Sequence, residues 1–519
     1  MLNYWWVTRP KRRLNSVPEV LTIIADSALN QEWKGQRGSH LTFENALEEA
    51  SLKRVGDRRD QTGGGGRTYV AWLASLGLIF KHEKSSQLKL TLAGEAIMSG
   101  DSPVTVLKGQ ILKYQFPSSY SLSRGVNVSP RFKIRPFRFL LRLLSDSEVQ
   151  YLTEHEIAKI VITEAENETD SCYKKIVTRI LEYRSDGDGC LEDDFTTKYS
   201  SSKGTVNLEH PFRHLLDIAN TIMNWLEYTQ LAKRDDDKKL KILPEKKEEV
   251  SSILANTPPF IDRPEQQEYF QRKYGIDPKR RKDTRNLSET RTITANIIAE
   301  QKVKQAFIIE SLVSPISKIT TDLIDKIADL TGIDTKFVEE TLLKLYPRGA
   351  IGSFMTGYFE MAFKGRDNAI EFEKATADLF ETVFGYESRH VGQIRLTPDV
   401  LLLSDADGYC GIIDNKAYRS YTISNDHRNR MIHNYIGGLQ NYYDGDLPLK
   451  FFSYIAGGFG TNIDAQVRDI FDETSVCGSA VSVSNIIAMV EKNLESPLSH
   501  ASIRELLSLN KQVLLRDIV

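Results

Sequence analysis

The chain has 519 residues, of which 40% are hydrophobic and 27% are charged, the composition of a soluble globular protein with several domains. These values exclude collagen-like, mucin-like and wholly disordered chains. The four cysteines are far apart and form no C-x-x-C pair, so we expect neither a disulfide scaffold nor a cysteine-rich zinc module, and a reducing cytoplasm is the natural compartment. No apolar run approaches the roughly 18 residues that a membrane-spanning helix needs, so we expect no membrane span.

Basic residues are concentrated in the first quarter of the chain. The whole sequence has 68 basic and 70 acidic residues, a formal net charge of −2. Residues 1–140 hold 21 Lys and Arg but only 11 Asp and Glu, which leaves 47 basic and 59 acidic residues for the remainder. A basic segment on a nearly neutral chain indicates a polyanionic partner such as nucleic acid, and an unevenly charged solvated surface is the alternative.

Residues 1–145 are interpreted as a winged-helix-like DNA-recognition subdomain. The apolar pattern of residues 71–80 predicts a helix that ends at Gly77 and is followed by a strand. Residues 81–87 form a polar turn, and residues 88–91 predict a second strand that leads into another helix. A helix, two strands and a helix is the order of a winged helix-turn-helix, although a small α/β hairpin without a DNA-reading role fits the same pattern.

Residues 146–255 repeat this order and are interpreted as a second winged-helix-like recognition subdomain. Thr153 and Glu156 have the spacing of a capping box, so a helix is expected to begin there. Residues 214–228 have helical spacing and lead into a hairpin with an acidic tip at residues 235–237. Two such units in series favour a DNA-reading platform, and a role in protein contacts alone is the alternative.

The second half of the chain changes character twice. Residues 256–350 are interpreted as a connector followed by a helical bridge, because prolines interrupt the first part and helical apolar spacing runs through residues 292–345. Residues 279–282 are a basic run that either contacts phosphates or forms a solvated loop. Residues 351–519 alternate short apolar strands with helices, which predicts an α/β domain with a central mixed sheet. The fold class is therefore multidomain α/β.

The residues that carry chemistry lie on two neighbouring predicted strands of the last domain. Asp399 begins one apolar strand, residues 404–408 form a turn, and Asp414 and Lys416 end the next strand. Antiparallel pairing brings these two strand ends together, and residues two apart on a strand point to the same face. We therefore expect two carboxylates and one amine to converge.

Such a set suits phosphodiester hydrolysis with Mg²⁺. This hard cation prefers oxygen ligands, which Asp399, Asp414 and the main-chain carbonyl of Asn415 would supply. Lys416 would hold or deprotonate the attacking water and balance the charge of the transition state. A D-x-K triplet alone arises by chance in many proteins, but a Pro-Asp pair, a hairpin and an apolar strand ending in D-x-K form a more specific pattern.

Residues 371–490 resemble the cleavage domain of FokI-like restriction endonucleases, which belong to type IIS. The matching segments keep their order along the chain, and they are Phe384-Gly385-Tyr386, Arg389-His390-Val391-Gly392, Pro398-Asp399, Ile413-Asp414-Asn415-Lys416-Ala417-Tyr418, Gly457-Gly458-Phe459 and Gly478-Ser479-Ala480-Val481-Ser482-Val483. The resemblance implies the PD-(D/E)xK nuclease fold, metal-binding roles for Asp399 and Asp414, and a catalytic lysine at Lys416. It also implies a supporting catalytic role for Glu373, at an acidic helix position.

The resemblance further implies that the protein pairs through its nuclease domains, as a homodimer or higher oligomer, when it cuts. Domains of this family each cut one strand, and Asp426 and Arg430 match the charged pair that the family uses across its dimer interface. This chain is shorter than the family between Lys416 and that helix. An ordinary pair of opposite charges four residues apart on a helix is the alternative reading of Asp426 and Arg430.

The N-terminal half is similar to AlwI-family endonucleases, which include related nicking enzymes. The similar segments are short: Trp33-Lys34-Gly35, Leu90-Thr91-Leu92-Ala93-Gly94, Lys113-Tyr114-Gln115-Phe116-Pro117-Ser118 and Ile134-Arg135-Pro136. This similarity implies a sequence-reading half built from winged-helix-like subdomains. The candidate DNA-binding residues are basic side chains of this region, namely Arg9, Lys11, Arg12, Arg13, Lys34, Arg37, Arg58, Arg59 and Arg67.

Four consecutive glycines, residues 63–66, precede Arg67. They either let the backbone approach a phosphate closely, with Arg67 entering a groove, or form an ordinary flexible loop. The run lacks the Lys-Ser/Thr pair of a nucleotide-binding P-loop.

These observations together predict a type IIS restriction endonuclease of the prokaryotic cytoplasm. It would bind a short asymmetric double-stranded DNA site and make Mg²⁺-dependent double-strand cuts at a fixed distance outside that site. The resemblance implies a cognate DNA methyltransferase that acts on the same site without a stable complex, and no membrane partner is expected. The alternatives are a strand-specific nicking endonuclease and, as a non-enzyme, a winged-helix DNA-binding regulator with a decayed nuclease domain.

Overall fold

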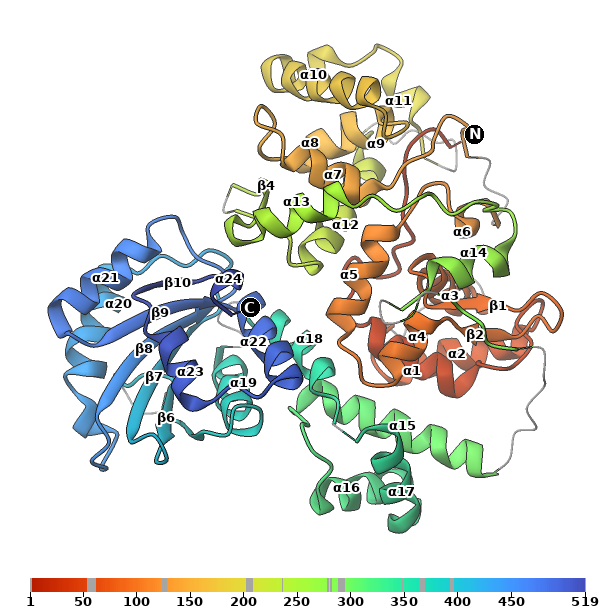
Figure 1. Ribbon diagram of the computed structural model, residues 1–519. Coiled ribbons are helices and arrows are strands. Elements are labelled where there is room, and N and C mark those ends of the chain that lie inside the picture. Colours follow the sequence, from red (N-terminus) through yellow and green to blue (C-terminus); the bar gives the residue numbers. More distant parts are fainter. Residues whose placement is uncertain are drawn as a thin grey trace. The chain divides into compact units, whose positions relative to one another are not determined.

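The structure is a computed structural model that divides into two compact units (Figure 1). The first unit contains residues 1–309 and 320–346, and the second contains residues 310–319 and 347–519. The described residues are 2–53, 62–123, 128–201, 209–235, 237–277, 280, 282–287, 295–347, 349–363, 369–392 and 396–518. Across these segments, no helix has both the length and the apolar character needed to cross a membrane.

The first part of the first unit contains the predicted order of helix, two strands and helix after two further helices. Its elements are α1 (Val17–Ser27), α2 (Arg37–Glu49), α3 (Gly64–Ser75), β1 (Ile79–Lys81), β2 (Leu88–Leu90) and α4 (Leu92–Met98), of which α3, β1, β2 and α4 form the predicted order. Gly77 ends the α3 segment with a φ of 71°, a conformation that glycine adopts without strain. Strands β1 and β2 pair antiparallel, and the Thr91 side chain caps α4 by accepting a hydrogen bond from the Gly94 amide. The predicted order of helices and strands in this segment is confirmed, and its role in DNA recognition stays a prediction.

The second part of this unit repeats the pattern around a longer helical insertion. Its elements are α5 (Pro103–Lys113), α6 (Ser119–Ser123), α7 (Pro136–Leu144), α8 (Glu154–Glu156), η1 (Ile157–Val161), α9 (Ile162–Glu164), α10 (Asp170–Asp186), η2 (Gly187–Cys190), α11 (Phe195–Lys198), α12 (Arg213–Tyr228), β3 (Ala232–Arg234) and β4 (Leu240–Ile242). The predicted capping box forms, because the Glu156 amide donates to the Thr153 side chain and the Thr153 amide donates to the Glu156 carboxylate. The predicted helix and hairpin become α12, β3 and β4.

The second predicted subdomain ends with η3 (Pro244–Lys246) and α13 (Lys247–Ala255). The segment predicted as a plain connector, which begins at residue 256, contains a short helix, α14 (Gln267–Tyr274), that packs against the first subdomain. Gln271 of α14 donates to the carbonyls of Ala74 and Ile79, at 2.6 and 3.2 Å. The sequence did not reveal α14 because it is short and mostly polar. The predicted helical bridge follows as α15 (Ala295–Val313), α16 (Thr321–Thr331) and α17 (Thr335–Leu345).

The basic N-terminal segment is packed into the second part of the first unit. The Trp5 side chain is buried, and its indole N–H donates to the Ala165 carbonyl at 2.8 Å. The Trp5 amide donates to the Ile162 carbonyl at 2.8 Å, and Arg131 holds the side chain and carbonyl of Asn3. These contacts join residues more than 100 positions apart, so local sequence patterns do not reveal them.

The second unit contains a mixed six-stranded sheet with the strand order β10-β9-β8-β7-β6-β5. Strands β5, β6 and β7 pair antiparallel, whereas β7, β8, β9 and β10 pair parallel. The elements are α18 (Ile351–Met361), α19 (Ala369–Thr382), β5 (Glu387–His390), β6 (Val400–Ser404), β7 (Tyr409–Lys416), α20 (Asn425–Asn429), η5 (Arg430–Ile436), η6 (Leu439–Asn441), β8 (Leu449–Ala456), α21 (Ile463–Thr474), β9 (Cys477–Ser482), α22 (Val483–Glu495), α23 (His500–Leu507), β10 (Lys511–Val513) and α24 (Leu515–Ile518). The predicted α/β domain with a central mixed sheet is confirmed.

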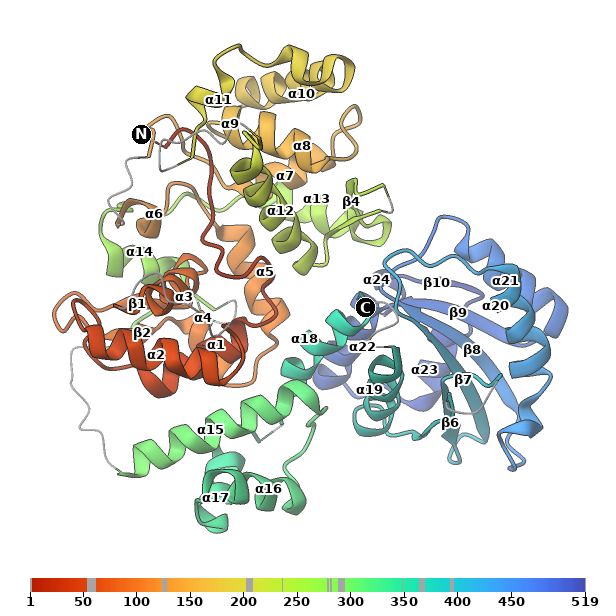
Figure 2. The same cartoon turned by 180° about the vertical axis from the view of Figure 1, so that it is seen from behind.

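Helices cover both faces of this sheet (Figure 2). Alternate residues of each strand enter different cores, as the period of two requires. Val400 and Ile413 belong to the core beneath α18, α19, α22 and α23, whereas Leu401 and Ile412 belong to the core beneath η5 and α21. This alternation decides which face each functional side chain of β6 and β7 occupies.

Candidate active site

Asp399, Asp414 and Lys416 meet at one end of the sheet, as predicted. The Asp399 amide donates to the Ile413 carbonyl at 3.1 Å, which continues the antiparallel pairing of β6 and β7 to the residues beyond Val400. By the alternation of side chains, all three lie on the face covered by η5 and α21. Lys416 Nζ lies 2.6 Å from Asp414 Oδ2.

The main chain of Asn415 connects the two strand ends. Its amide donates to Asp399 Oδ2 at 2.5 Å, so the carboxylate of one strand is held by the backbone of the other. The Asn415 side chain points to the opposite face of the sheet and donates to Thr376 of α19 at 2.6 Å. The peptide of Asn415 is therefore fixed from both faces.

The carboxylates of this site are crowded and poorly compensated. Burial raises the pKa of Asp399 well above its usual value, and the neighbouring charges of Asp414 and Glu373 raise it further, against the opposing effect of Lys416. Burial alone would lower the pKa of the Lys416 amine, but Asp414 and Asp399 outweigh burial and raise it. Lys416 is therefore an ammonium at neutral pH.

Glu373 lies at the edge of the same cluster and has a partner that the sequence did not single out. Its Oε2 atom is 3.0 Å from Nε2 of His390, the last residue of β5. A Cβ atom added to Gly392 would lie 3.0 Å from Glu373 Oε2 and 3.2 Å from Asp399 Oδ1, so both carboxylates border the same space. The only sequence signal for His390 was its place in a segment that resembled the nuclease family.

The site fits a divalent cation that binds oxygen. Asp414 Oδ1 is buried and has no hydrogen-bond partner, an unfavourable state that a cation relieves. In the part of the chain that the structure describes, no group of three or more His, Cys, Asp or Glu side chains is arranged to hold an ion. Two carboxylates and one main-chain carbonyl suit Mg²⁺, because this ion keeps several waters and takes one or two protein carboxylates beside a substrate phosphate.

Tyrosines form the wall beside Asp414. Burial raises the pKa of Tyr421 and Tyr435, and the charge of Asp414 raises both further. Tyr454 is completely buried, and the Tyr421 hydroxyl lies 2.8 Å from Nδ1 of His427. These phenols stay protonated, so the wall is neutral and apolar apart from its hydroxyl groups.

Asp426 and Arg430 form an exposed ion pair on the surface next to this wall. Their side chains lie 2.8 Å apart, with Asp426 in α20 and Arg430 at the start of η5, and they are 65% and 44% exposed. The geometry is that of two charges one helical turn apart. An intermolecular role for this pair stays a prediction.

Several predicted DNA-binding residues are engaged inside the first unit. Arg12 forms an ion pair with Asp217 at 2.6 Å. Arg9 is partly buried, and burial lowers its pKa. Arg67 donates to the carbonyl and hydroxyl of Thr62, at 2.6 and 3.2 Å. These three side chains have structural contacts that their positive charge alone did not predict.

Other predicted DNA-binding residues are more accessible. Lys34 and Arg37 are exposed at the start of α2, Arg13 is exposed, and Lys11 is partly buried. Arg58 and Arg59 lie outside the described residues. Arg13, Lys34 and Arg37 are therefore accessible to a polyanion.

The glycine run forms the start of a helix. Gly63 has a φ of 80°, and the following glycines form the first turn of α3. A Cβ at Gly63 would lie 2.5 Å from the His40 Cβ, and a Cβ at Gly66 would lie 2.6 Å from the His40 carbonyl oxygen. The run therefore lets α3 begin against α2. The interpretation as an ordinary flexible loop is wrong, and an approach of this backbone to a phosphate stays a prediction.

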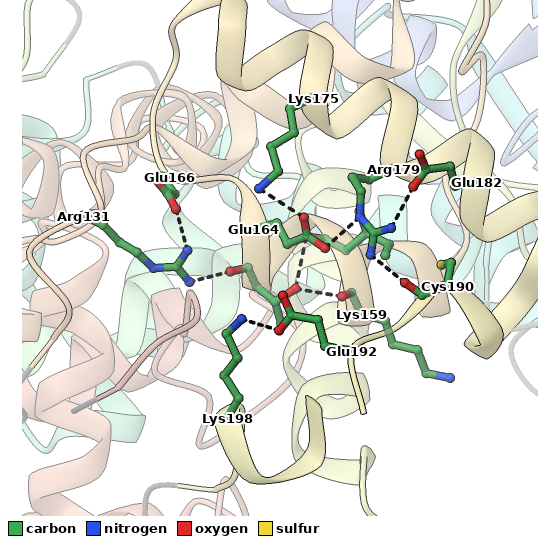
Figure 3. Close-up of polar contacts among 12 residues, drawn as sticks. Arg131, Lys159, Glu164, Glu166, Lys175, Arg179, Glu182, Cys190, Glu192 and Lys198 are labelled. Atoms are coloured by element: carbon green, nitrogen blue, oxygen red, sulfur yellow. Dashed lines mark hydrogen bonds and ion pairs between the residues drawn. The ribbon is translucent and has the colours of Figure 1, made fainter. Parts of the chain in front are cut away.

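The second part of the first unit contains a dense network of ion pairs (Figure 3). Arg179 joins Glu164 at 3.1 Å and Glu182 at 2.7 Å, while Arg131 joins Glu166 at 2.7 Å and the Thr163 carbonyl at 2.6 Å. Arg179 therefore joins α10 to α9, and Arg131 holds its own segment against the end of α9. Because basic residues of this region also make such internal contacts, their number is a poor measure of DNA-binding surface.

One comparison with known protein families matches a segment that includes most of the second unit. Residues 332–514 match the family profile described as the FokI cleavage domain. This match indicates a FokI-like cleavage domain, the type of domain that gives restriction endonucleases their DNA phosphodiester hydrolase activity. Among curated proteins, none matches the chain. No comparison shows the similarity of the N-terminal half to AlwI-family endonucleases, which stays a prediction.

Solved structures are similar to the chain only at low identity. The restriction endonuclease FokI has 15% identity and a TM-score of 0.29, with 99% of this chain and 100% of that chain covered. FokI bound to DNA has 14% identity and a TM-score of 0.29, with 99% of each chain covered. The BpuJ1 endonuclease binding domain, in complex with pyrene- and phenanthrene-modified DNA, has 16% identity and a TM-score of 0.36, with 52% of this chain and 97% of that chain covered.

Proposed function

We propose that the protein is a type IIS restriction endonuclease that binds a short asymmetric double-stranded DNA site and cuts both strands at a fixed distance outside it. The convergence of Asp399, Asp414 and Lys416, inside the segment that matches the FokI cleavage domain, carries this proposal. Binding would belong to the first unit, whose winged-helix-like order and exposed Lys34 and Arg37 suit DNA.

Mg²⁺ is the cofactor that these residues fit, and Asp399, Asp414 and the carbonyl of Asn415 would hold it. When bound, Mg²⁺ supplies a Lewis acid that lowers the pKa of water and neutralises charge on the phosphate. Lys416, as an ammonium, would donate to a phosphate oxygen and balance the negative charge that develops there. Glu373 would support the site at its edge, in contact with His390.

We further propose that two nuclease units act together, because each would cut one strand. The partners are then double-stranded DNA and a second copy of the chain, with Asp426 and Arg430 as candidate interface residues. A cognate DNA methyltransferase would act on the same site without a stable complex. A single copy bound at a single site would cut poorly, so the cutting rate should rise with enzyme concentration more steeply than in direct proportion.

Digestion of a plasmid library with Mg²⁺, followed by run-off sequencing, tests this proposal. We expect a short asymmetric site with cuts at one fixed distance on each strand. Lys416→Ala and Asp399→Ala should each lower the rate at least about 1,000-fold, while DNA binding persists. Lys450→Ala is the matched control, since Lys450 is exposed at the start of the neighbouring strand β8.

The products distinguish the alternative functions. Nicked circles without linear DNA would identify a strand-specific nicking endonuclease. Specific binding without any Mg²⁺-dependent cutting would identify a regulator with an inactive nuclease domain. Full cutting by Lys416→Ala would contradict the assignment of the site.

A further inference from the structure

A buried chain of polar side chains runs from α18 to the end of β7, on the face opposite the candidate active site. The Tyr358 hydroxyl lies 2.8 Å from Thr376 Oγ1, and the Asn415 amide group donates to the same oxygen at 2.6 Å. Tyr358 and Thr376 are completely buried, and Asn415 is 7% exposed. We call these three residues the hydroxyl relay.

Hydrogen-bond chemistry fixes the direction of each contact in the hydroxyl relay. Thr376 Oγ1 donates its only hydrogen to the Phe372 carbonyl of its own helix, at 2.9 Å. Its two lone pairs are then available to accept from Tyr358 and from Asn415. The Thr376 hydroxyl is thus fully used, and no other described group is needed to complete it.

The hydroxyl relay ends on the residue that organises the candidate site. The main-chain amide of Asn415 donates to Asp399 Oδ2, and its main-chain carbonyl is the predicted third oxygen ligand. Because the Asn415 side chain is anchored to Thr376, the main-chain torsions of Asn415 are restrained, and the orientations of its amide and carbonyl are restrained with them. The hydroxyl relay thus joins the end of β7 to α19 through Thr376 and to α18 through Tyr358.

We propose that Thr376 and Tyr358 are positioning residues that set the affinity of the site for its divalent cation, by fixing the peptide of Asn415 from the far side of the sheet. This inference rests on the proposed function, in which Asp399, Asp414 and Asn415 hold the cation. Partners behind the direct ligands of a metal commonly set its affinity by 10- to 100-fold. Thr376 and Tyr358 would contact neither the substrate nor the cation, and would act only through Asn415.

The test compares variants that remove one buried hydroxyl. Thr376→Val keeps the shape of the side chain but leaves Asn415 without its partner, and Thr376→Ser restores the hydroxyl. Tyr386→Phe is the matched control: Tyr386 and Tyr409 also share a buried hydroxyl contact, at 2.6 Å, and Tyr409 begins β7 at the end of the strand far from Lys416. All variants would be examined in the full-length protein.

The first measurement is the binding of Mn²⁺ to the protein without DNA. The electron paramagnetic resonance signal of the free ion reports how much Mn²⁺ remains unbound. We expect Thr376→Val to weaken Mn²⁺ binding about 10- to 100-fold, Thr376→Ser to stay within about threefold of the unmodified protein, and Tyr386→Phe to bind as the unmodified protein does. Equal Mn²⁺ affinity of Thr376→Val and Tyr386→Phe would overturn the inference. If Thr376→Val does not fold, Tyr358→Phe should still weaken Mn²⁺ binding about threefold relative to Tyr386→Phe, and equality there would also overturn it.

The second measurement is the Mg²⁺ concentration that gives half-maximal DNA cutting. It should rise for Thr376→Val and be restored by Thr376→Ser, even though thermal stability falls for both Thr376→Val and Tyr386→Phe. Failure of the two proposals is distinguishable. Mn²⁺ binding that follows the hydroxyl relay, without any DNA cutting, would contradict the proposed function alone, whereas cutting with unchanged metal dependence in Thr376→Val would contradict the positioning role alone.

Discussion

The two units use buried charge in opposite ways. In the first unit, two buried cations have anionic partners: Arg135 contacts Glu168, and Lys159 contacts Asp188 at 2.5 and 2.7 Å. In the second unit, the sheet end at Asp414 holds several carboxylates around one lysine, and one carboxylate oxygen has no partner at all. Charge is paired within the fold at these positions of the first unit, and carboxylate charge is left poorly compensated at the sheet end of the second.

This difference teaches where a charge count is informative. A buried carboxylate without sufficient compensation is costly, so a fold that retains it points to a function. A buried cation with a matched partner points to structure. The excess of basic residues in residues 1–140 is therefore weaker evidence for a function on DNA than the three charged residues Asp399, Asp414 and Lys416 at the ends of β6 and β7.

The largest expected effect on stability tests the paired charges of the first unit. Arg135 precedes α7, contacts both oxygens of Glu168 and lies over the Phe260 ring at 4.3 Å, with its side chain only 6% exposed. Arg135→Ala leaves Glu168 unpaired and should lower the free energy of unfolding by about 3–5 kcal/mol. Urea denaturation measures the loss.

Arg142→Ala is the control for this experiment. Arg142 lies on α7, pairs with Asp170 at 2.6 Å and lies over the Tyr173 ring at 3.9 Å, but its ion pair is largely exposed to solvent, so its removal should cost much less than the removal of Arg135. A loss for Arg135→Ala no larger than the loss for Arg142→Ala would contradict a structural role for the buried charges of this unit.

A smaller effect with the opposite sign is expected in the second unit. Because the pKa of Asp399 is raised in the folded state, its ionisation costs stability as the pH rises above the usual value of about 4. Asp399→Asn removes the charge and should stabilise the metal-free protein by about 1–2 kcal/mol at neutral pH, while it abolishes cutting. The gain should be larger at about pH 8 than at about pH 5, because the cost of ionising Asp399 grows as the pH rises from the usual aspartate pKa toward its raised pKa in the folded protein.

Thermal unfolding in a chelator at both pH values measures this gain. Asp405→Asn is the control, since Asp405 lies in an exposed turn and should show no pH-dependent gain. A metal-free Asp399→Asn protein that is no more stable than the unmodified protein at pH 8 would show that the carboxylates are not strained by one another. The contrast between the units would then lose its basis.

The fold and the site were predictable where the pattern was local. The D-x-K strand end, the capping box at Thr153 and both hairpins depend on residues close in sequence, and their geometry followed from the period of a strand or a helix. Strands β5, β9 and β10 were not predicted from their own residues, because they are short and partly polar. Their pairing is decided by neighbours in the sheet.

Contacts between distant residues were not predictable. The ion pair of Arg12 with Asp217 and the hydroxyl relay each join side chains on elements far apart in sequence. The loop interpretation of residues 63–66 was wrong for the same reason, because these glycines allow α3 to lie close to His40, a residue more than 20 positions earlier in the chain. A single sequence contains no information on which distant residue a given side chain will contact.

A weaker effect should separate paired from unpaired candidates for DNA binding. Lys34→Ala combined with Arg37→Ala removes two exposed cations and should weaken DNA binding about 3- to 10-fold, or roughly 0.7–1.4 kcal/mol, and lower the salt dependence. Arg12→Ala should have a smaller effect on binding, because Arg12 is already paired with Asp217. Fluorescence anisotropy at several salt concentrations measures both, and equal losses would show that internal pairing does not remove a basic residue from DNA contact.

The smallest expected effect on stability concerns Asp426 and Arg430. Two exposed charges one turn apart contribute only about 0.3–0.5 kcal/mol, so Asp426→Ala should leave thermal unfolding almost unchanged. The same substitution becomes informative when cutting is measured against enzyme concentration. If the pair lies between two copies, cutting by Asp426→Ala should fall at low concentration and recover at high concentration, because the lost contact weakens association rather than chemistry.

Arg428→Ala provides the comparison, since Arg428 is on the same helix but pairs within the unit with Asp469 and Glu473 of α21. Identical concentration curves for Asp426→Ala and the unmodified protein would assign the Asp426–Arg430 pair to the surface of a single copy. A curve displaced for Asp426→Ala but not for Arg428→Ala would place an intermolecular contact on this helix. Charge would then serve a third purpose in this chain, beside holding the first unit together and receiving a cation in the second.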